Sequence, residues 1–242
     1  MLYDDPMLPP GLEPQLRRLV AAFLEENTKV NLSAFRTEEQ CWKGNVLDSL
    51  AVLELPIFEA TRSAPLPSGE GWGVRVLDLG TGGGFPLLPL AIALPHAQLT
   101  GIDSVRKKTD AVARIAASLR LTNVRTLTGR AEALGRDPAY REQFDIVTSR
   151  AVASLSVLLE YAAPFVRPQG HIVLWKSVAI EREVQDSLLA RAELSAICRA
   201  VAVMPSIAIC TARLSMPRWP ASADMEACTR NAVSPDRNIS RP

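Results

Sequence analysis

The spacing of apolar and polar positions changes along this chain of 242 residues and predicts two regions of different architecture. Over residues 12–27, apolar side chains recur three or four positions apart, which indicates an amphipathic helix. A second helix is expected to begin at residues 37–40, TEEQ, which have the form of a capping box, and to continue through Leu53. We therefore predict an N-terminal helical element over residues 1–58.

From residue 74 onward, short apolar runs alternate with longer helical patterns. The expected strands are 74–79, 98–103, 124–127, 144–148 and 171–175, with a closing pair at 197–203 and 207–211. The expected helices are 86–94, 105–119, 154–166 and 179–194. This alternation predicts an α/β fold with a doubly wound, mostly parallel sheet. Ligands of such sheets bind at the carboxyl ends of the strands.

Composition marks the expected domain boundaries. Residues 59–73 are rich in Pro, Gly and Ser, so we predict a linker there. The sheet domain is expected over 74–214. Residues 215–242 show neither periodicity nor a core pattern, and we predict a disordered or aberrant tail.

The bulk properties narrow the class of protein. The formal net charge is only +1, so charge alone does not indicate nucleic-acid binding. Four cysteines without CxxC spacing and only two histidines predict neither a metal site nor a disulfide framework. The N-terminus lacks the basic start and apolar run of a signal peptide, and no apolar stretch is long enough to span a membrane. We expect a soluble cytoplasmic protein.

The strongest local signal is the segment 76–86, VLDLGTGGGFP, where a predicted strand enters a glycine-rich turn and then a helix. Its spacing is GxGxG rather than the GxGxxG of dinucleotide-binding folds, because Phe85 occupies the sixth position. The pair Phe85-Pro86 suits a pyrophosphate poorly, since that group needs free N–H groups at a helix start. We predict a cofactor bearing an amino acid, the alternative being a glycine turn without a ligand. The three glycines of the pattern are Gly80, Gly82 and Gly84.

Further candidates lie at the ends of later strands. Asp103 ends the second strand, where a carboxylate can accept both ribose hydroxyls; the alternative is a helix cap, for which Ser104 is better suited. Ala131 and Glu132 follow the third strand, where a loop backbone can bind an adenine edge, although Glu132 alone is typical of a solvated charge. Arg150 ends the fourth strand and offers a fork of donors, or forms a structural salt bridge.

Together, these pieces resemble the small-subunit ribosomal RNA guanine-N7 methyltransferases, also called the glucose-inhibited division protein B family. The resemblance covers about residues 12–195. It is carried by Asn27-Thr28-Lys29-Val30-Asn31-Leu32-Ser33, Leu47-Asp48-Ser49-Leu50, the segment 76–86, Arg130-Ala131-Glu132, Ser149-Arg150-Ala151 and Trp175-Lys176. The first two pieces lie outside the generic methyltransferase core, so they indicate the family rather than the fold.

The resemblance implies a Rossmann-like methyltransferase domain behind the N-terminal element, with S-adenosyl-L-methionine as cofactor. The implied target is N7 of a guanine in 16S ribosomal RNA, free or within the 30S subunit, and we expect a monomer. The family's cofactor positions correspond to Gly80, Phe85, Ala131, Glu132 and Arg150, with Asp103 as the expected ribose ligand. Arg150 is also the predicted catalytic residue, orienting cofactor or guanine, since N7 has a free lone pair and needs alignment rather than a base. The predicted RNA contacts are Asn31, Arg36, Arg106, Lys107 and Lys176.

The chain departs from the family in three places. Asn45 stands where the family usually has His, residues 109–110 replace an apolar pair, and residues after about 195 do not match the family's basic C-terminus. These departures keep open a cofactor-binding protein of the same fold without activity. A nicotinamide-dependent oxidoreductase is a further alternative, against which the residues 85–86 argue.

Overall fold

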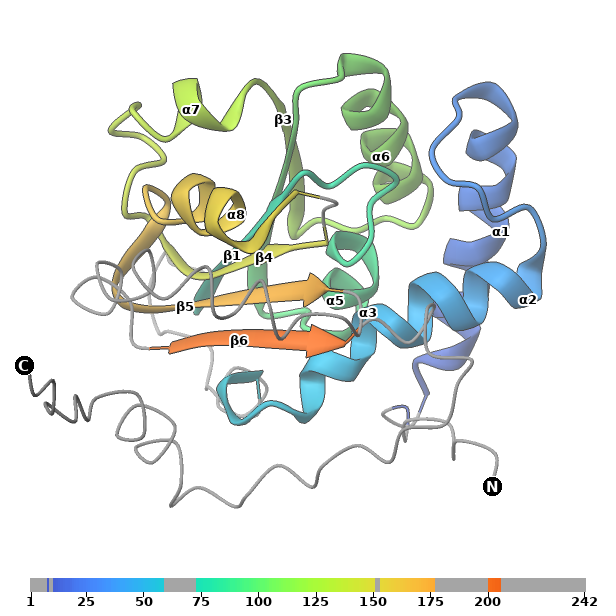
Figure 1. The fold of residues 1–242 in the computed structure, drawn as a ribbon. Coiled ribbons are helices and arrows are strands. Elements are labelled where there is room, and N and C mark those ends of the chain that lie inside the picture. The colour runs from blue at the N-terminus through green and yellow to red at the C-terminus, as the bar shows by residue number, and fades with distance from the viewer. Residues whose placement is uncertain (1–7, 9–10, 59–72, 151–152, 177–199, 206–242) are drawn as a thin grey trace, which may run out of the picture. The chain divides into compact units, whose positions relative to one another are not determined.

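The computed structural model describes residues 8, 11–58, 73–150, 153–176 and 200–205 (Figure 1). Four predicted segments lie wholly or mostly outside these residues, namely 59–73, 179–194, 207–211 and 215–242. No helix in the described part of the chain is long and apolar enough to cross a membrane.

A parallel sheet forms the centre of the described structure, with the strand order β3-β2-β1-β4-β5-β6. Its strands are β1 (Val74–Leu79), β2 (Ala97–Asp103), β3 (Val124–Thr128), β4 (Phe144–Ser149), β5 (Val166–Lys176) and β6 (Ala200–Pro205). On β1, Val76 lies opposite Leu99 of β2 on one side and Ile146 of β4 on the other. The strand order reverses between β1 and β4, and a ligand crevice is expected at the carboxyl ends of that pair. The predicted α/β sheet is confirmed.

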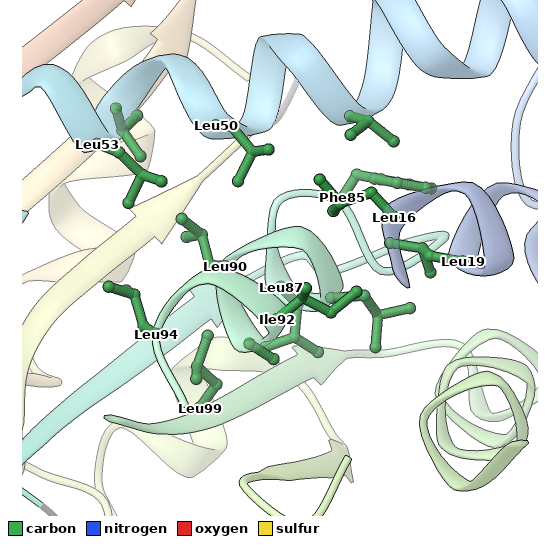
Figure 2. Close-up of a cluster of buried hydrophobic side chains, with 14 of the residues drawn as sticks. Leu16, Leu19, Leu50, Leu53, Phe85, Leu87, Leu90, Ile92, Leu94 and Leu99 are labelled. Carbon is green, nitrogen blue, oxygen red and sulfur yellow. The ribbon is translucent and has the colours of Figure 1, made fainter. Parts of the chain in front are cut away.

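Helices cover both faces of this sheet. Successive strand residues point to opposite sides, and both sides carry apolar side chains that must be buried. Val76 and Ile146 face one apolar cluster, while Leu77 and Val147 face the other. The first cluster joins the N-terminal element to α5 (Leu87–Ala93) and α6 (Arg106–Ser118). The second packs under α8 (Leu155–Ala162), with α7 (Ala131–Leu134) at its edge. Figure 2 shows the first cluster, in which leucines from α1 and from the second helical segment meet the side chains of α5.

The N-terminal element confirms the two predicted helical segments and differs in the winding of the second. Helix α1 (Glu13–Lys29) has Pro14 in its first turn, and α2 (Glu38–Cys41) begins with the predicted capping box between Thr37 and Gln40. The chain then winds as a π-helix, η1 (Trp42–Leu47), a short α3 (Asp48–Leu50) and a 3₁₀ turn, η2 (Ala51–Glu54). Wide π turns are rare and are often found at functional sites. Apolar periodicity alone does not distinguish these windings.

This element packs directly onto the glycine-rich turn. The rings of Phe23 in α1 and Phe85 meet edge to face with centroids 4.9 Å apart. A Cβ on Gly83 would lie 2.9 Å from the Phe23 ring, so this approach requires glycine. Glu26 of α1 is nearly buried and pairs with Arg114 of α6 at 2.7 Å. The N-terminal element therefore packs against the turn that follows β1 and holds it in place.

Candidate functional site

The glycine-rich turn crosses from β1 to the end of β2. The backbone N–H groups of Gly80 and Thr81 both donate to the Ile102 carbonyl at 2.9 Å. Gly80 has φ +75° and Gly82 has φ +53°, a conformation that side chains with a Cβ rarely adopt. A Cβ on Gly80 would meet no atom within 4 Å, so the space beside this residue is open. The turn is shaped to let a ligand approach the backbone.

Asp103 is fixed at the end of β2 by two backbone donors. Its Oδ2 accepts from the Gly82 N–H at 3.0 Å, and its Oδ1 accepts from the Val105 N–H at 2.8 Å. Helix α6 follows without a side-chain cap, so the predicted preference for Ser104 as the cap is wrong and Asp103 supports the helix start itself. Each carboxylate oxygen accepts more than one hydrogen bond, which leaves capacity for a pair of ligand hydroxyls.

An open cleft of ≈ 360 Å³ lies at the carboxyl ends of the strands. Four of the predicted residues line it together, namely Gly80, Asp103, Ala131 and Glu132. They come from the ends of β1 and β2 and from α7 after β3, which the strand order brings to one edge. The volume lies within the range of small-molecule and cofactor sites. The other lining residues are Leu79, Ile102, Ser104, Gly129, Arg130, Ser149, Ala153, Leu158 and Tyr161.

Tyr161 of α8 belongs to the cleft although no sequence pattern singled it out. Its hydroxyl lies close to the Glu132 carboxylate, and both side chains line the cleft. The pKa of Glu132 is lowered, first by its own backbone N–H and then by this hydroxyl. The Glu132 charge in turn raises the pKa of Tyr161. A helix residue on the face toward the sheet gives no signal of this role before the fold is known.

Asp78 is a second polar residue that the sequence analysis did not select. It is buried as the next-to-last residue of β1, and the Thr148 hydroxyl donates to its Oδ1 at 3.1 Å. Its Oδ2 has no partner in hydrogen-bonding geometry among the described residues, although Thr81 and Leu87 lie near enough to favour the charged form. Burial raises the pKa of Asp78 to about 6, against the opposing charge of Arg150 and these donors. Its position just before the glycine turn was the available signal.

Arg150 lies at the carboxyl end of β4, next to Ser149, which lines the cleft. Its guanidinium is largely buried and contacts the N-terminal element: Nε lies 3.1 Å from Oδ2 of the fully buried Asp48. The salt bridge foreseen as an alternative for this residue is present. Its role toward cofactor or guanine stays a prediction.

Phe85, Gly82 and Gly84 do not line the cleft. Gly82 acts on it through the N–H that holds Asp103, whereas Phe85 is buried against Phe23. A Cβ on Gly84 would lie 2.7 Å from the Leu88 side chain, so this glycine permits the close packing of α5. Direct cofactor contacts by these three residues stay predictions.

The predicted RNA contacts lie in two separate places. Asn31 and Arg36 line a hollow of ≈ 520 Å³ beside the end of α1, and Nη2 of Arg36 donates to Oδ1 of Asn31 at 2.7 Å. Arg106 and Lys107 are exposed at the start of α6, close in sequence to Asp103. Lys176 is the last residue of β5, and its side chain lies outside the described residues. Within the described part of the chain, no group of three or more His, Cys, Asp or Glu is arranged to hold a metal ion.

Comparison with known proteins identifies the family to which this arrangement belongs. The family model of rRNA small subunit methyltransferase G matches residues 12–204. The chain is 43% identical over 182 residues to the ribosomal RNA small subunit methyltransferase G of Deinococcus radiodurans, covering 75% of this chain and 67% of the relative. It is 40% identical over 173 residues to that of Desulfitobacterium hafniense, covering 72% and 66%. A Thermoanaerobacter relative is 36% identical over 178 residues, covering 74% and 69%.

The matches therefore span about two thirds of the length of these relatives. The family consists of S-adenosylmethionine-dependent rRNA methyltransferases, so the predicted fold, enzyme class and cofactor are confirmed at the level of the family. The Rossmann-like sheet and the cleft at its strand ends agree with that assignment. The chain belongs to the rRNA small subunit methyltransferase G family.

Proposed function

We propose that this chain transfers the methyl group of S-adenosyl-L-methionine to N7 of a guanine in 16S ribosomal RNA, acting as a monomer on the 30S subunit. The observation that carries the proposal is the cleft at the β1–β4 reversal, in which Gly80, Asp103, Ala131 and Glu132 converge. The resemblance assigned these same positions to the cofactor, and they come from segments far apart in the sequence.

The residues present fit this cofactor. Asp103 is held by two backbone N–H groups and would accept the ribose hydroxyls with its remaining lone pairs. The first turn of α7, at Ala131 and Glu132, forms the side of the cleft that suits the adenine edge, next to Tyr161. The backbone at Gly80 borders open space, where the amino-acid part of the cofactor would lie. When bound, the sulfonium supplies an activated methyl group.

Methyl transfer to guanine N7 requires the protein to align the reactants and does not require a proton transfer. Guanine N7 carries a free lone pair, so no base is required before attack, and correct placement of the reactants supplies most of the acceleration. Arg150 is the residue proposed to orient the cofactor or the guanine, since it follows the cleft-lining Ser149 on β4. Its guanidinium also lies close enough to the buried Asp78 to affect that carboxyl group electrostatically.

RNA binding is proposed to use the hollow at Asn31 and Arg36 and the exposed start of α6 at Arg106 and Lys107. Lys176, at the end of β5, is proposed as a further contact with the RNA backbone. Contacts between basic side chains and phosphates release counterions from the RNA, and that release is less favourable at higher salt. This binding is therefore expected to fall steeply with ionic strength. Neutralising Arg106 and Lys107 together should reduce that salt dependence.

The proposal is tested by incubating the full chain with radiolabelled S-adenosyl-L-methionine and 30S subunits from a strain that lacks the modification, followed by nucleoside analysis. We expect the label in 7-methylguanosine. Asp103→Ala should abolish transfer by weakening cofactor binding, and Asp137→Ala, at an exposed turn outside the cleft, should not. Cofactor binding without transfer would instead favour the inactive binding protein, and label in another nucleoside would refute the proposed target atom.

A further inference from the structure

The Leu-Asp-Ser piece that helped identify the family lies outside the cleft, yet its aspartate contacts the proposed catalytic arginine. We infer that Asp48 is a positioning residue for methyl transfer, which holds the guanidinium of Arg150 at the carboxyl end of β4. This inference rests on the proposed function, in which Arg150 orients the cofactor or the guanine. It assigns a purpose to a motif that the cofactor site leaves unexplained.

The guanidinium is fixed from three directions by the N-terminal element. Nε of Arg150 lies 3.1 Å from Oδ2 of Asp48, and Nη1 donates to Oδ1 of Asn45 at 3.2 Å. Nη2 donates to the backbone carbonyl of Gly44. A guanidinium has five N–H donors, so these contacts leave two for a ligand. The guanidinium is thus held in one orientation and still has N–H groups available to a ligand.

The residues that hold Arg150 are themselves immobilised. Asp48 is fully buried, and the indole N–H of Trp175 on β5 donates to its backbone carbonyl at 3.0 Å. The Ser49 hydroxyl donates to the backbone carbonyl of Asn45 one turn earlier. The anchor for Arg150 is therefore tied to the sheet by a hydrogen bond from β5, although it comes from the N-terminal element.

Stability alone is a poor explanation for this arrangement. A buried ion pair loses about as much in desolvation as it gains in attraction, so apolar residues of the same size would serve the fold equally well. Such a pair does fix geometry, whereas an unanchored arginine side chain loses rotamer entropy when a ligand orders it. Because Asp48 already orders the Arg150 side chain, ligand binding does not incur this loss of entropy.

The experiment is a double-mutant cycle in the full-length chain, with Asp48→Asn, Arg150→Gln and the combination. For each variant, kcat and KM are measured with 30S subunits lacking the modification, and the melting temperature is recorded. The control is Asp145→Asn near the amino end of β4, which removes the carboxylate charge of a more exposed Asp–Arg pair, with Arg167 at 2.6 Å. Asn45→Ala, which removes another acceptor without leaving an unpaired charge, serves if Asp48→Asn does not fold.

Misplacement of a reacting group by about 1 Å can cost up to about 100-fold in rate, so we expect Asp48→Asn to lower kcat about tenfold or more with KM for the cofactor close to the native value. In the Arg150→Gln background, Asp48→Asn and Asn45→Ala should then lower kcat no further. A lowered melting temperature with native kcat, or equal losses in both backgrounds, would show a purely structural pair and overturn the inference. Absence of methyl transfer by the native chain would instead refute the proposed function.

Discussion

Asp78 provides a quantitative test of the electrostatics at the strand ends. The pKa of this fully buried carboxyl is raised from its ordinary 3.8 to about 6, chiefly by burial. The folded state therefore holds the proton more tightly than the unfolded chain. The contribution of Asp78 to the free energy of unfolding is fully present below pH 3.8 and is lost as the pH rises through 6. The protein therefore becomes less stable over that pH window. One pKa unit corresponds to about 1.4 kcal/mol, so the full loss is about 3 kcal/mol.

Asp78→Asn removes this titration and keeps the shape of the side chain. Linkage predicts that the substitution is more favourable at pH 8 than at pH 5 by roughly 1.4 kcal/mol, about half of the full effect. The difference between the two pH values cancels the packing cost of the amide, which is the same at both. Urea unfolding followed by tryptophan fluorescence at each pH measures it, with Asp137→Asn at an exposed turn as the control.

The same variant should weaken binding of the cationic cofactor, because Oδ2 of Asp78 is a buried acceptor without a partner among the described residues. A variant that is more stable at pH 8 and binds S-adenosyl-L-methionine less well would show that the carboxylate is kept at a cost to the fold. If Asp78→Asn and the native chain unfold with the same pH dependence, the account of this site is wrong.

Three further predictions concern the N-terminal element and its contacts with the sheet domain. Gly83→Ala would place a Cβ 2.9 Å from the Phe23 ring and should lower the free energy of unfolding by about 1–3 kcal/mol; an unchanged urea midpoint would contradict the packing described. Asn27→Ala removes the side chain that bonds the backbone of residues 32–35 and should cost about 2–3 kcal/mol, with faster amide exchange in that loop as the diagnostic. The pKa of Glu26 is lowered, first by Arg114, so its contribution is present above its unfolded pKa and is lost as the pH falls through the folded value. Glu26→Gln should therefore flatten the acid limb of the stability curve, with less than about 1 kcal/mol lost at pH 7 because Arg114 is half exposed. An acid limb identical to the native one would refute that assignment.

Much of the fold followed from the sequence because the relevant signals are local. Apolar runs and helical spacing located β1 to β4 and the second half of β5, although β5 begins at Val166, where the sequence predicted the end of a helix. The rule that ligands bind at strand ends predicted that Asp103 and Ala131 would lie at one edge of the sheet. The capping box at Thr37 fixed the start of the second helical segment, since it depends only on residues three apart. Winding within that segment did not follow, because α, π and 3₁₀ turns share similar apolar spacing.

What the sequence did not reveal depends on packing between distant segments. The contact between Asn45 and Arg150 joins residues 105 positions apart, and no periodicity encodes it. Tyr161 enters the cleft because α8 packs over β4, which sets the direction of its side chain. The raised pKa of Asp78 likewise comes from burial, and the sequence marks only its position beside the glycine turn.

Methylation of a guanine of 16S ribosomal RNA is the activity proposed for this chain. The most direct test is to express it in a bacterial strain deleted for its own enzyme of this family, digest the purified 16S rRNA and quantify 7-methylguanosine by mass spectrometry. We predict that the native chain restores the nucleoside and that an equally abundant Asp103→Ala variant does not. Full-length native protein present at normal abundance without any 7-methylguanosine at the position left unmodified by the deletion would contradict the account.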